Sequence, residues 1–74
     1  MVKKISERIR NLRNEKELTP NQLATIFNIY TTTLNRYEDG TNVPNLVMMV
    51  KIANYFGVSL DYLVGRTDKR EVNK

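Results

Sequence analysis

The sequence contains no cysteine and no histidine. Without cysteine the chain forms no disulfide and no thiolate metal site, and nothing in it points to an oxidising compartment. Most zinc sites, and most pairs of nucleophile and general base, also need one of these two residue types. The composition therefore disfavours an enzyme, and we predict no catalytic residue, no metal and no cofactor.

Long hydrophobic runs are absent as well. No apolar segment approaches the roughly 20 residues that span a membrane, and none follows the two lysines near the N-terminus as in a secretory signal. We therefore expect a cytoplasmic protein without membrane contact. The length of 74 residues predicts one small domain with a modest core.

Acidic residues are fewer than basic ones, and the net charge is +4. A basic chain is consistent with a polyanionic partner such as nucleic acid. Many small domains are also mildly basic, so the charge alone does not decide. Between residues 19 and 37 the only charged side chain is that of Arg36.

Helix signals recur along the chain and predict an all-α fold. Apolar spacing and capping residues place helices at about 4–16, 20–27, 31–39, 46–56 and 60–64. The second helix has the clearest start, because Thr19 and Gln22 form a capping box around Pro20.

The fourth helix carries an apolar stripe that predicts its buried face. The stripe consists of Leu46, Met49, Val50 and Ala53, and either Ile52 or Phe56 is expected to be buried beside it. After the fifth helix, residues 66–74 form a charged segment that we expect to be a flexible tail. The predicted domain therefore covers residues 1–65.

The second and third predicted helices are joined by about three residues, which suits a helix-turn-helix at about 19–39. In that motif the second helix enters the DNA major groove. Three successive threonines are poor helix formers, but their hydroxyl and methyl groups suit contact with DNA. Simple capping by Thr31 or Thr33 is the alternative.

The outward residues of this motif are the predicted DNA contacts. Base contacts are predicted for Thr31, Thr32, Asn35 and Arg36. Contacts to the DNA backbone are predicted for Asn21, Gln22, Tyr30, Thr33, Asn42 and Arg10.

The stretch LTPNQLATIFNIYTTTLNRYEDGTNVPNLVMMVKIANYFGVSLDYLVG resembles the Cro/repressor-type (XRE, lambda-repressor-like) helix-turn-helix family. The resemblance rests on Leu18-Thr19, Leu23-Ala24, RYEDG before a loop with Pro44, and FGVSLDYLVG. It implies a five-helix DNA-binding domain, usually a dimeric repressor on a palindromic operator. It also implies a structural ion pair between Arg13 and Glu38.

Two departures from the family bear on DNA contact. Family members often begin the second helix with a glutamine that contacts a phosphate and braces the third helix, but this chain has Pro20 there. The loop at 41–43 is uncharged where the family often carries Lys or Arg. We therefore expect modest affinity for each monomer and a dependence of affinity on salt that is shallower than for a lysine-rich DNA-binding protein.

Two sets of residues are candidates for a homodimer interface. The resemblance implies the fifth helix, with Leu60, Asp61 and Val64. The chain itself adds Val47 and Met48, which fall outside the apolar stripe of the fourth helix and are either an interface or incidentally exposed.

The leading interpretation is a small DNA-binding repressor of a phage, mobile element or bacterium. Its partners would be double-stranded DNA and a second copy, with no evident small-molecule ligand. The alternative is an antitoxin or adaptor-like protein-interaction module built on the same fold.

Overall fold

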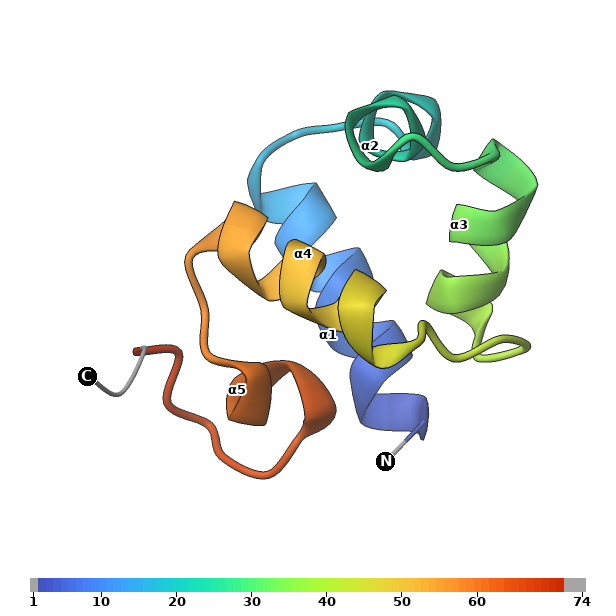
Figure 1. Ribbon diagram of the computed structural model, residues 1–74. Coiled ribbons are helices and arrows are strands. Elements are labelled where there is room, and N and C mark those ends of the chain that lie inside the picture. Colours follow the sequence, from blue (N-terminus) through green and yellow to red (C-terminus); the bar gives the residue numbers. More distant parts are fainter. Residues whose placement is uncertain (1, 72–74) are drawn as a thin grey trace.

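A computed structural model describes residues 2–71 of the chain, and five α-helices make up its regular structure there (Figure 1). Met1 and residues 72–74, which belong to the predicted domain and tail, lie outside the described residues. The helices are α1 (Val2–Glu15), α2 (Pro20–Phe27), α3 (Thr31–Asp39), α4 (Leu46–Phe56) and α5 (Leu60–Val64). No strand occurs within residues 2–71. The all-α prediction is confirmed.

The helix ends follow local capping chemistry. The Gln22 amide N–H donates to Thr19 Oγ1 at 3.1 Å, and the Thr19 N–H donates to Gln22 Oε1 at 2.8 Å. These two bonds complete the predicted capping box. Asn45 and Ser59 likewise accept backbone N–H bonds at the starts of α4 and α5. The sequence therefore placed these ends correctly, because caps are local signals.

The core lies where all five helices meet. Helix α4 crosses in front of α1, with α2 above, α3 on one side and α5 below (Figure 1). Helix α1 contacts both α3 and α5, and α2 contacts α3. Each helix contributes one large, fully buried side chain: Ile9, Leu23, Leu34, Ile52 and Leu63. Burial of these five therefore couples every helix to the same core.

The predicted buried face of α4 is partly wrong. Leu46 and Val50 were predicted to be buried but are 63% and 40% exposed. Ala53 is buried as predicted, and so is Ile52, one of the two residues expected beside the stripe. Met48, predicted to lie outside the buried stripe, packs against the core. Helix α4 is apolar around most of its circumference, so its sequence fits more than one buried face. Packing against the other helices selects the observed one.

The segment after α5 contacts the body of the protein. The buried Arg8 guanidinium donates to the carbonyls of Tyr62 and Thr67 and to the Asp68 carboxylate. It also lies 4.0 Å from the centre of the Tyr62 ring. Arg8, which the sequence offered only as one of many basic residues, thus connects α1, α5 and this segment.

A second attachment lies a few residues further on. The Arg70 guanidinium donates two hydrogen bonds to the Glu15 carboxylate, at 2.7 and 2.6 Å. The Ser59 N–H donates to the Arg70 carbonyl at 2.8 Å. The predicted flexibility of residues 66–74 stays a prediction, but residues 67–70 make these specific contacts.

Candidate nucleic-acid interface

Helices α2 and α3 are joined by a tight turn of three residues, 28–30. Asn28 adopts the left-handed conformation (φ 56°, ψ 46°), and its backbone N–H bonds to carbonyls of the last turn of α2. Asparagine tolerates this conformation better than most residues that carry a side chain. Ile29 then donates its N–H to Ala24 O at 3.0 Å and packs against the core. The turn therefore fixes the direction in which α3 leaves α2.

An ion pair attaches the far end of α3 to α1. Arg13 Nε donates to Glu38 Oε2 at 2.7 Å, and Arg13 Nη2 donates to Glu38 Oε1 at 3.0 Å. The same guanidinium donates to the Leu18 carbonyl at 2.8 Å. Only 13% and 9% of the Arg13 and Glu38 side chains are exposed. This is the pair that the family resemblance implies, and its geometry makes Arg13 a structural residue.

A side-chain hydrogen bond attaches the near end of α3 to α2. Thr31 Oγ1 donates to Asn21 Oδ1 at 2.9 Å. The bond uses the carbonyl side of the Asn21 amide, so its NH₂ group is left as a donor. The position that glutamine often fills in the family is Pro20 here, and the bracing contact to α3 comes from the next residue. No local sequence signal predicted it, because the partners are ten residues apart.

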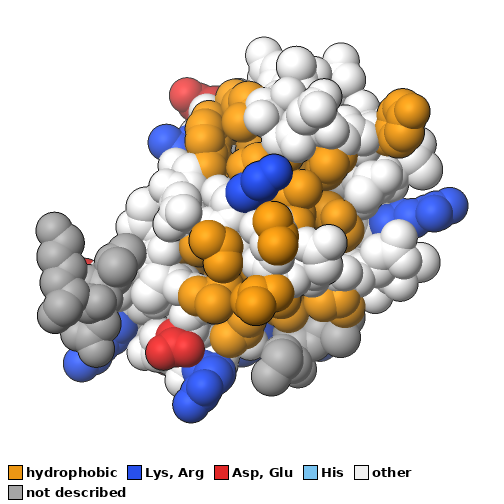
Figure 2. All heavy atoms as spheres, in the orientation of Figure 1, with side chains coloured by type: hydrophobic (Ala, Val, Ile, Leu, Met, Phe, Trp, Pro, Cys, Tyr) orange, Lys and Arg blue, Asp and Glu red, His pale blue; other side chains and the backbone are white. Residues whose placement is uncertain are grey.

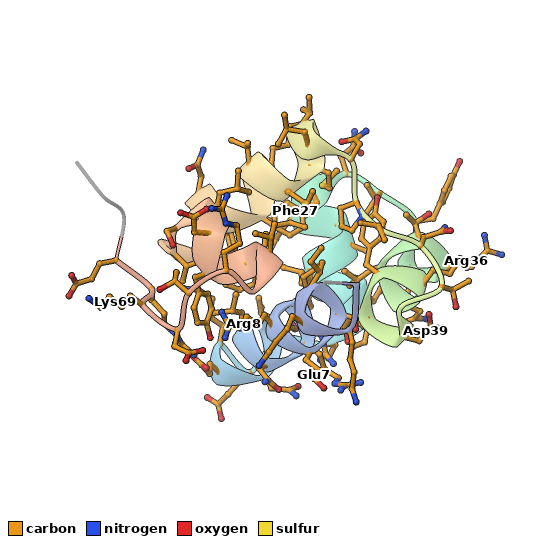
Figure 3. The ribbon with its side chains drawn as sticks, turned by 90° about the horizontal axis from the view of Figure 1, so that it is seen from below. Glu7, Arg8, Phe27, Arg36, Asp39 and Lys69 are labelled. Atoms are coloured by element: carbon orange, nitrogen blue, oxygen red, sulfur yellow. The ribbon has the colours of Figure 1, made fainter. Side chains whose placement is uncertain are left out.

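The outward face of α3 is polar and accessible. Thr32, Asn35 and Arg36 are exposed, while Thr31 is half-buried. Figure 3 shows Arg36 extending away from the body of the molecule, on the opposite side from Lys69. Of the four predicted base-contact residues, three are therefore free to reach a ligand, and Thr31 is committed to Asn21.

The first turn of α3 has no side-chain cap. Its N-cap residue is Tyr30, which makes no capping hydrogen bond and is 83% exposed. The alternative that Thr31 or Thr33 caps this helix is therefore wrong. The free N–H groups at a helix start attract anions such as phosphate, and here they directly follow the exposed Tyr30.

The other predicted backbone-contact residues lie on several elements. Asn21, Gln22, Asn42 and Arg10 are exposed, and Thr33 is half-buried. The Oε1 atom of Gln22 is already used in the capping box. The loop residue Thr41 donates its N–H to Asp39 at 2.8 Å, and hydrogen bonds from Thr41 lower the pKa of the Asp39 carboxyl. The loop next to α3 is therefore held by the last residue of that helix.

The candidate dimer residues differ in accessibility. Val47 is 66% exposed and Asp61 is exposed. Leu60 and Val64 are half-buried. Met48 is also half-buried and, like Val64, packs against the core.

Two further observations concern other classes of site. In the part of the chain that the structure describes, no group of three or more acidic or other ligating side chains could hold a metal ion. No helix within residues 2–71 has the length and apolar character needed to cross a bilayer.

A fold of five helices with a tight α2–turn–α3 unit, and a polar α3 anchored at both ends, defines a helix-turn-helix protein. Comparison with known families agrees, since the helix-turn-helix family model matches residues 9–63. The chain belongs to this family, in its Cro/repressor (XRE) type. The family is one of transcription regulators and not a class of enzymes.

Curated relatives carry regulator names. The chain is 37% identical over 70 residues to the cryptic phage CTXphi transcriptional repressor RstR of Vibrio cholerae serotype O1, covering 92% of this chain and 62% of RstR. It is 37% identical over 62 residues to the uncharacterized HTH-type transcriptional regulator YobD of Bacillus subtilis, covering 84% and 55%. It is 32% identical over 59 residues to the HTH-type transcriptional activator BcrR of Enterococcus faecalis, covering 80% and 29%.

The chain thus spans about 60% or less of the length of these relatives. No solved structure is matched.

Proposed function

We propose that the chain is a sequence-specific double-stranded DNA-binding repressor, with α3 in the major groove and two copies on a palindromic operator. The observation that carries the proposal is the presentation of α3. Its polar face is exposed, while Glu38 and Thr31 attach its two ends to α1 and α2. A recognition helix needs this combination, because base readout requires accessible side chains held at fixed positions.

Each residue on the proposed surface has a chemical role. Asn35 suits a bidentate contact with adenine and Arg36 one with guanine. Thr32 offers a methyl group for thymine and a hydroxyl for a base or phosphate. The Asn21 NH₂ group, the free N–H groups at the start of α3 and the exposed Arg10 would hold phosphates. No enzymatic step is proposed, and the cytoplasm stays the predicted location.

Selection from a randomised duplex pool tests the function directly. We expect the purified chain, at near-physiological salt, to enrich an inverted repeat with half-site centres about 10 bp apart. Retention that is unenriched and disappears with added salt would reduce the interaction to phosphate contact. The protein-interaction module would then become the better interpretation.

The variant Arg36→Ala tests whether the outward face of α3 contacts the DNA bases. We expect affinity for the selected site to fall roughly ten-fold or more, with relaxed preference at one base pair, because a bidentate arginine–guanine contact is lost. Binding isotherms on the selected site and its point variants measure both effects.

Lys69→Ala is the matched control, because it removes one positive charge from the opposite side of the molecule (Figure 3). We expect it to keep the specificity and nearly all of the affinity. Equal losses in the two variants would show that Arg36 acts only through net charge, against its assigned role.

A further inference from the structure

Asp39 is the one exposed residue of α3 to which the proposed DNA contacts give no role. The exposed residues of this helix are Thr32, Asn35, Arg36 and Asp39. Their spacing of i, i+3, i+4 and i+7 is that of one face of a helix. Figure 3 shows Arg36 and Asp39 on the same side of the molecule. Asp39 therefore belongs to the face that would meet DNA.

The carboxylate of Asp39 is a negative charge held in place at the end of α3. Its Oδ1 atom accepts the Thr41 N–H at 2.8 Å. Hydrogen bonds from Thr41, and to a smaller extent the charge of Arg36, lower the pKa of Asp39 below its ordinary value. The group is therefore ionised at neutral pH, and its exposed position leaves the charge open to a neighbouring molecule.

This carboxylate makes the exposed surface of the helix-turn-helix electrically neutral. From residue 18 to residue 50, the only charged residues are Arg36, Glu38 and Asp39. Glu38 is largely buried and paired with Arg13, so Arg36 and Asp39 are the two exposed charges of this stretch. Their charges are opposite and cancel. The net positive charge of the chain therefore comes from residues outside the helix-turn-helix.

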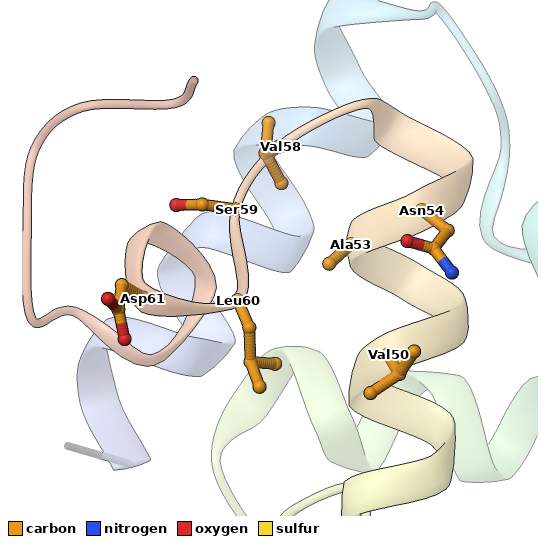
Figure 4. Close-up of a pocket in the computed structure, with 7 residues that line it drawn as sticks. All are labelled: Val50, Ala53, Asn54, Val58, Ser59, Leu60 and Asp61. Carbon is orange, nitrogen blue, oxygen red and sulfur yellow. The ribbon is translucent and has the colours of Figure 1, made fainter. Parts of the chain in front are cut away.

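The α4 side of the molecule supplies little positive charge to offset Asp39. Lys51 is the only charged residue of α4, and the groove between α4 and α5 carries a carboxylate, that of Asp61 (Figure 4). Figure 2 shows hydrophobic and other uncharged side chains over most of the face on which α4 lies. This side therefore offers phosphates no cluster of lysine and arginine side chains.

The place of Asp39 in the helix determines which part of a duplex it would face. The first turn of a recognition helix contacts base edges, and Asp39 follows Thr32 by seven residues, a rise of about 10 Å. The major groove is about 12 Å wide and has a phosphate backbone along each edge. With Thr32 on the bases, Asp39 therefore lies near one edge of the groove, closer to a phosphate than to a base.

We propose that Asp39 repels a DNA phosphate at the end of the recognition helix and so lowers the affinity of the chain for DNA of any sequence. The inference rests on the proposed function, because it takes α3 as the helix in the groove. Sequence-independent affinity comes mostly from attraction to phosphates. A neutral surface with Asp39 at the groove edge removes part of that attraction, so binding depends more on the base contacts of Asn35 and Arg36.

The variant Asp39→Asn tests the inference. Asparagine keeps the shape and still offers an oxygen to the Thr41 N–H, so the turn should be kept while the charge is lost. Two unit charges roughly 7 Å apart in water interact strongly enough to change a binding constant about three-fold. We therefore expect the variant to bind a random duplex about three-fold or more tightly at about 50 mM salt. The gain should shrink as added salt screens the charge.

On the selected site, the affinity of Asp39→Asn should rise by a similar factor, with the preference at each base pair unchanged. Binding isotherms on the selected site, its point variants and a random duplex measure these effects. A fall in affinity for the selected site with relaxed preference at one base pair would overturn the inference, because Asp39 would then accept a bond from a base such as cytosine.

Glu71→Gln is the matched control. It removes one exposed negative charge two residues after Lys69, which lies on the opposite side of the molecule from Arg36 (Figure 3). We expect it to bind both kinds of duplex as wild type does. An equal gain in the two variants would show that only net charge matters, and this too overturns the inference.

Two further outcomes separate the inference from the function on which it rests. Binding of the random duplex that is the same in Asp39→Asn and wild type rejects the repulsion, whatever the selection yields. If wild type enriches no duplex but Asp39→Asn still gains affinity for random DNA, the repulsion is supported and only the sequence-specific function is rejected.

Discussion

Arginines that look alike in the sequence have different roles in the structure of this protein. Arg8, Arg13 and Arg36 are all arginines on helices of a basic chain. Arg8 is buried against Tyr62, Arg13 is paired with Glu38, and Arg36 is exposed on α3. Only the last of these three is available for a ligand. The net charge of the chain therefore overestimates the number of positive side chains that can contact DNA.

The Arg13–Glu38 pair leads to a prediction at the residue scale. We expect Glu38→Ala to destabilise the fold by about 3 kcal/mol or more, because it leaves the largely buried guanidinium without its carboxylate. Urea unfolding of the purified variant measures the loss.

A double-mutant cycle supplies the control. Combining Glu38→Ala with Arg13→Met removes the orphaned charge, so the combined loss should be clearly smaller than the sum of the two single losses. Additive losses would mean that the two side chains do not act as a coupled pair.

At the scale of elements, the helix-turn-helix is formed largely by capping and turn residues that act locally. The capping box begins α2, Asn28 ends it, and the turn leads to α3 within three residues. These capping and turn residues fix the ends of the helices but not the orientation of one helix relative to the other. The orientation comes from contacts between elements, such as the bond from Thr31 to Asn21.

The cap of α2 can be tested by Thr19→Ala. The change removes the acceptor for the Gln22 N–H, and we expect a loss of about 1 kcal/mol in the free energy of unfolding. Thr25→Ala is a suitable control, because Thr25 is an exposed threonine inside the same helix. It should be nearly neutral, since alanine is the better helix former. Equal losses in both variants would argue against a specific capping effect.

On the scale of the whole molecule, the segment after α5 packs against the N-terminal helix α1. Residues 67–70 contact α1 and α5 through Arg8, Glu15 and Ser59. Gly65, at φ +87°, lies so close to α1 that a Cβ atom there would come within 2.7 Å of Lys4 Cβ. The close approach of the two segments therefore depends on glycine at this position.

This attachment should respond to acid. The two hydrogen bonds from Arg70 lower the pKa of the Glu15 carboxyl below its ordinary value near 4.5. A carboxyl whose pKa is lower in the folded state stabilises the fold above its unfolded pKa, and the contribution is lost as pH falls through the folded pKa. The pair is half-exposed, so we expect only about 0.2–1 kcal/mol.

Glu15→Gln tests the contribution, because glutamine keeps the shape but does not titrate. Its effect on urea unfolding should be present at about pH 7 and absent at about pH 3. A difference between the variant and wild type that stays constant across this range would show that Glu15 stabilises the fold by packing and not by its charge.

The sequence by itself determined the helices, because caps, turns and apolar spacing act over a few residues. Thr19 with Gln22, Asn45 and Ser59 each begin a helix as predicted. The Cro/repressor resemblance and the outward polar face of α3 followed from the same local patterns, since an α-helix has a fixed period.

Only the tertiary structure decided which faces are buried and which polar groups meet. Helix α4 is apolar on two sides, so the spacing of its apolar residues alone could not tell the buried face with Ile52 and Ala53 from the exposed face with Leu46 and Val47. The bond from Thr31 to Asn21 and the burial of Arg8 join residues distant in sequence. Such contacts depend on how all five helices pack, so local sequence patterns do not predict them.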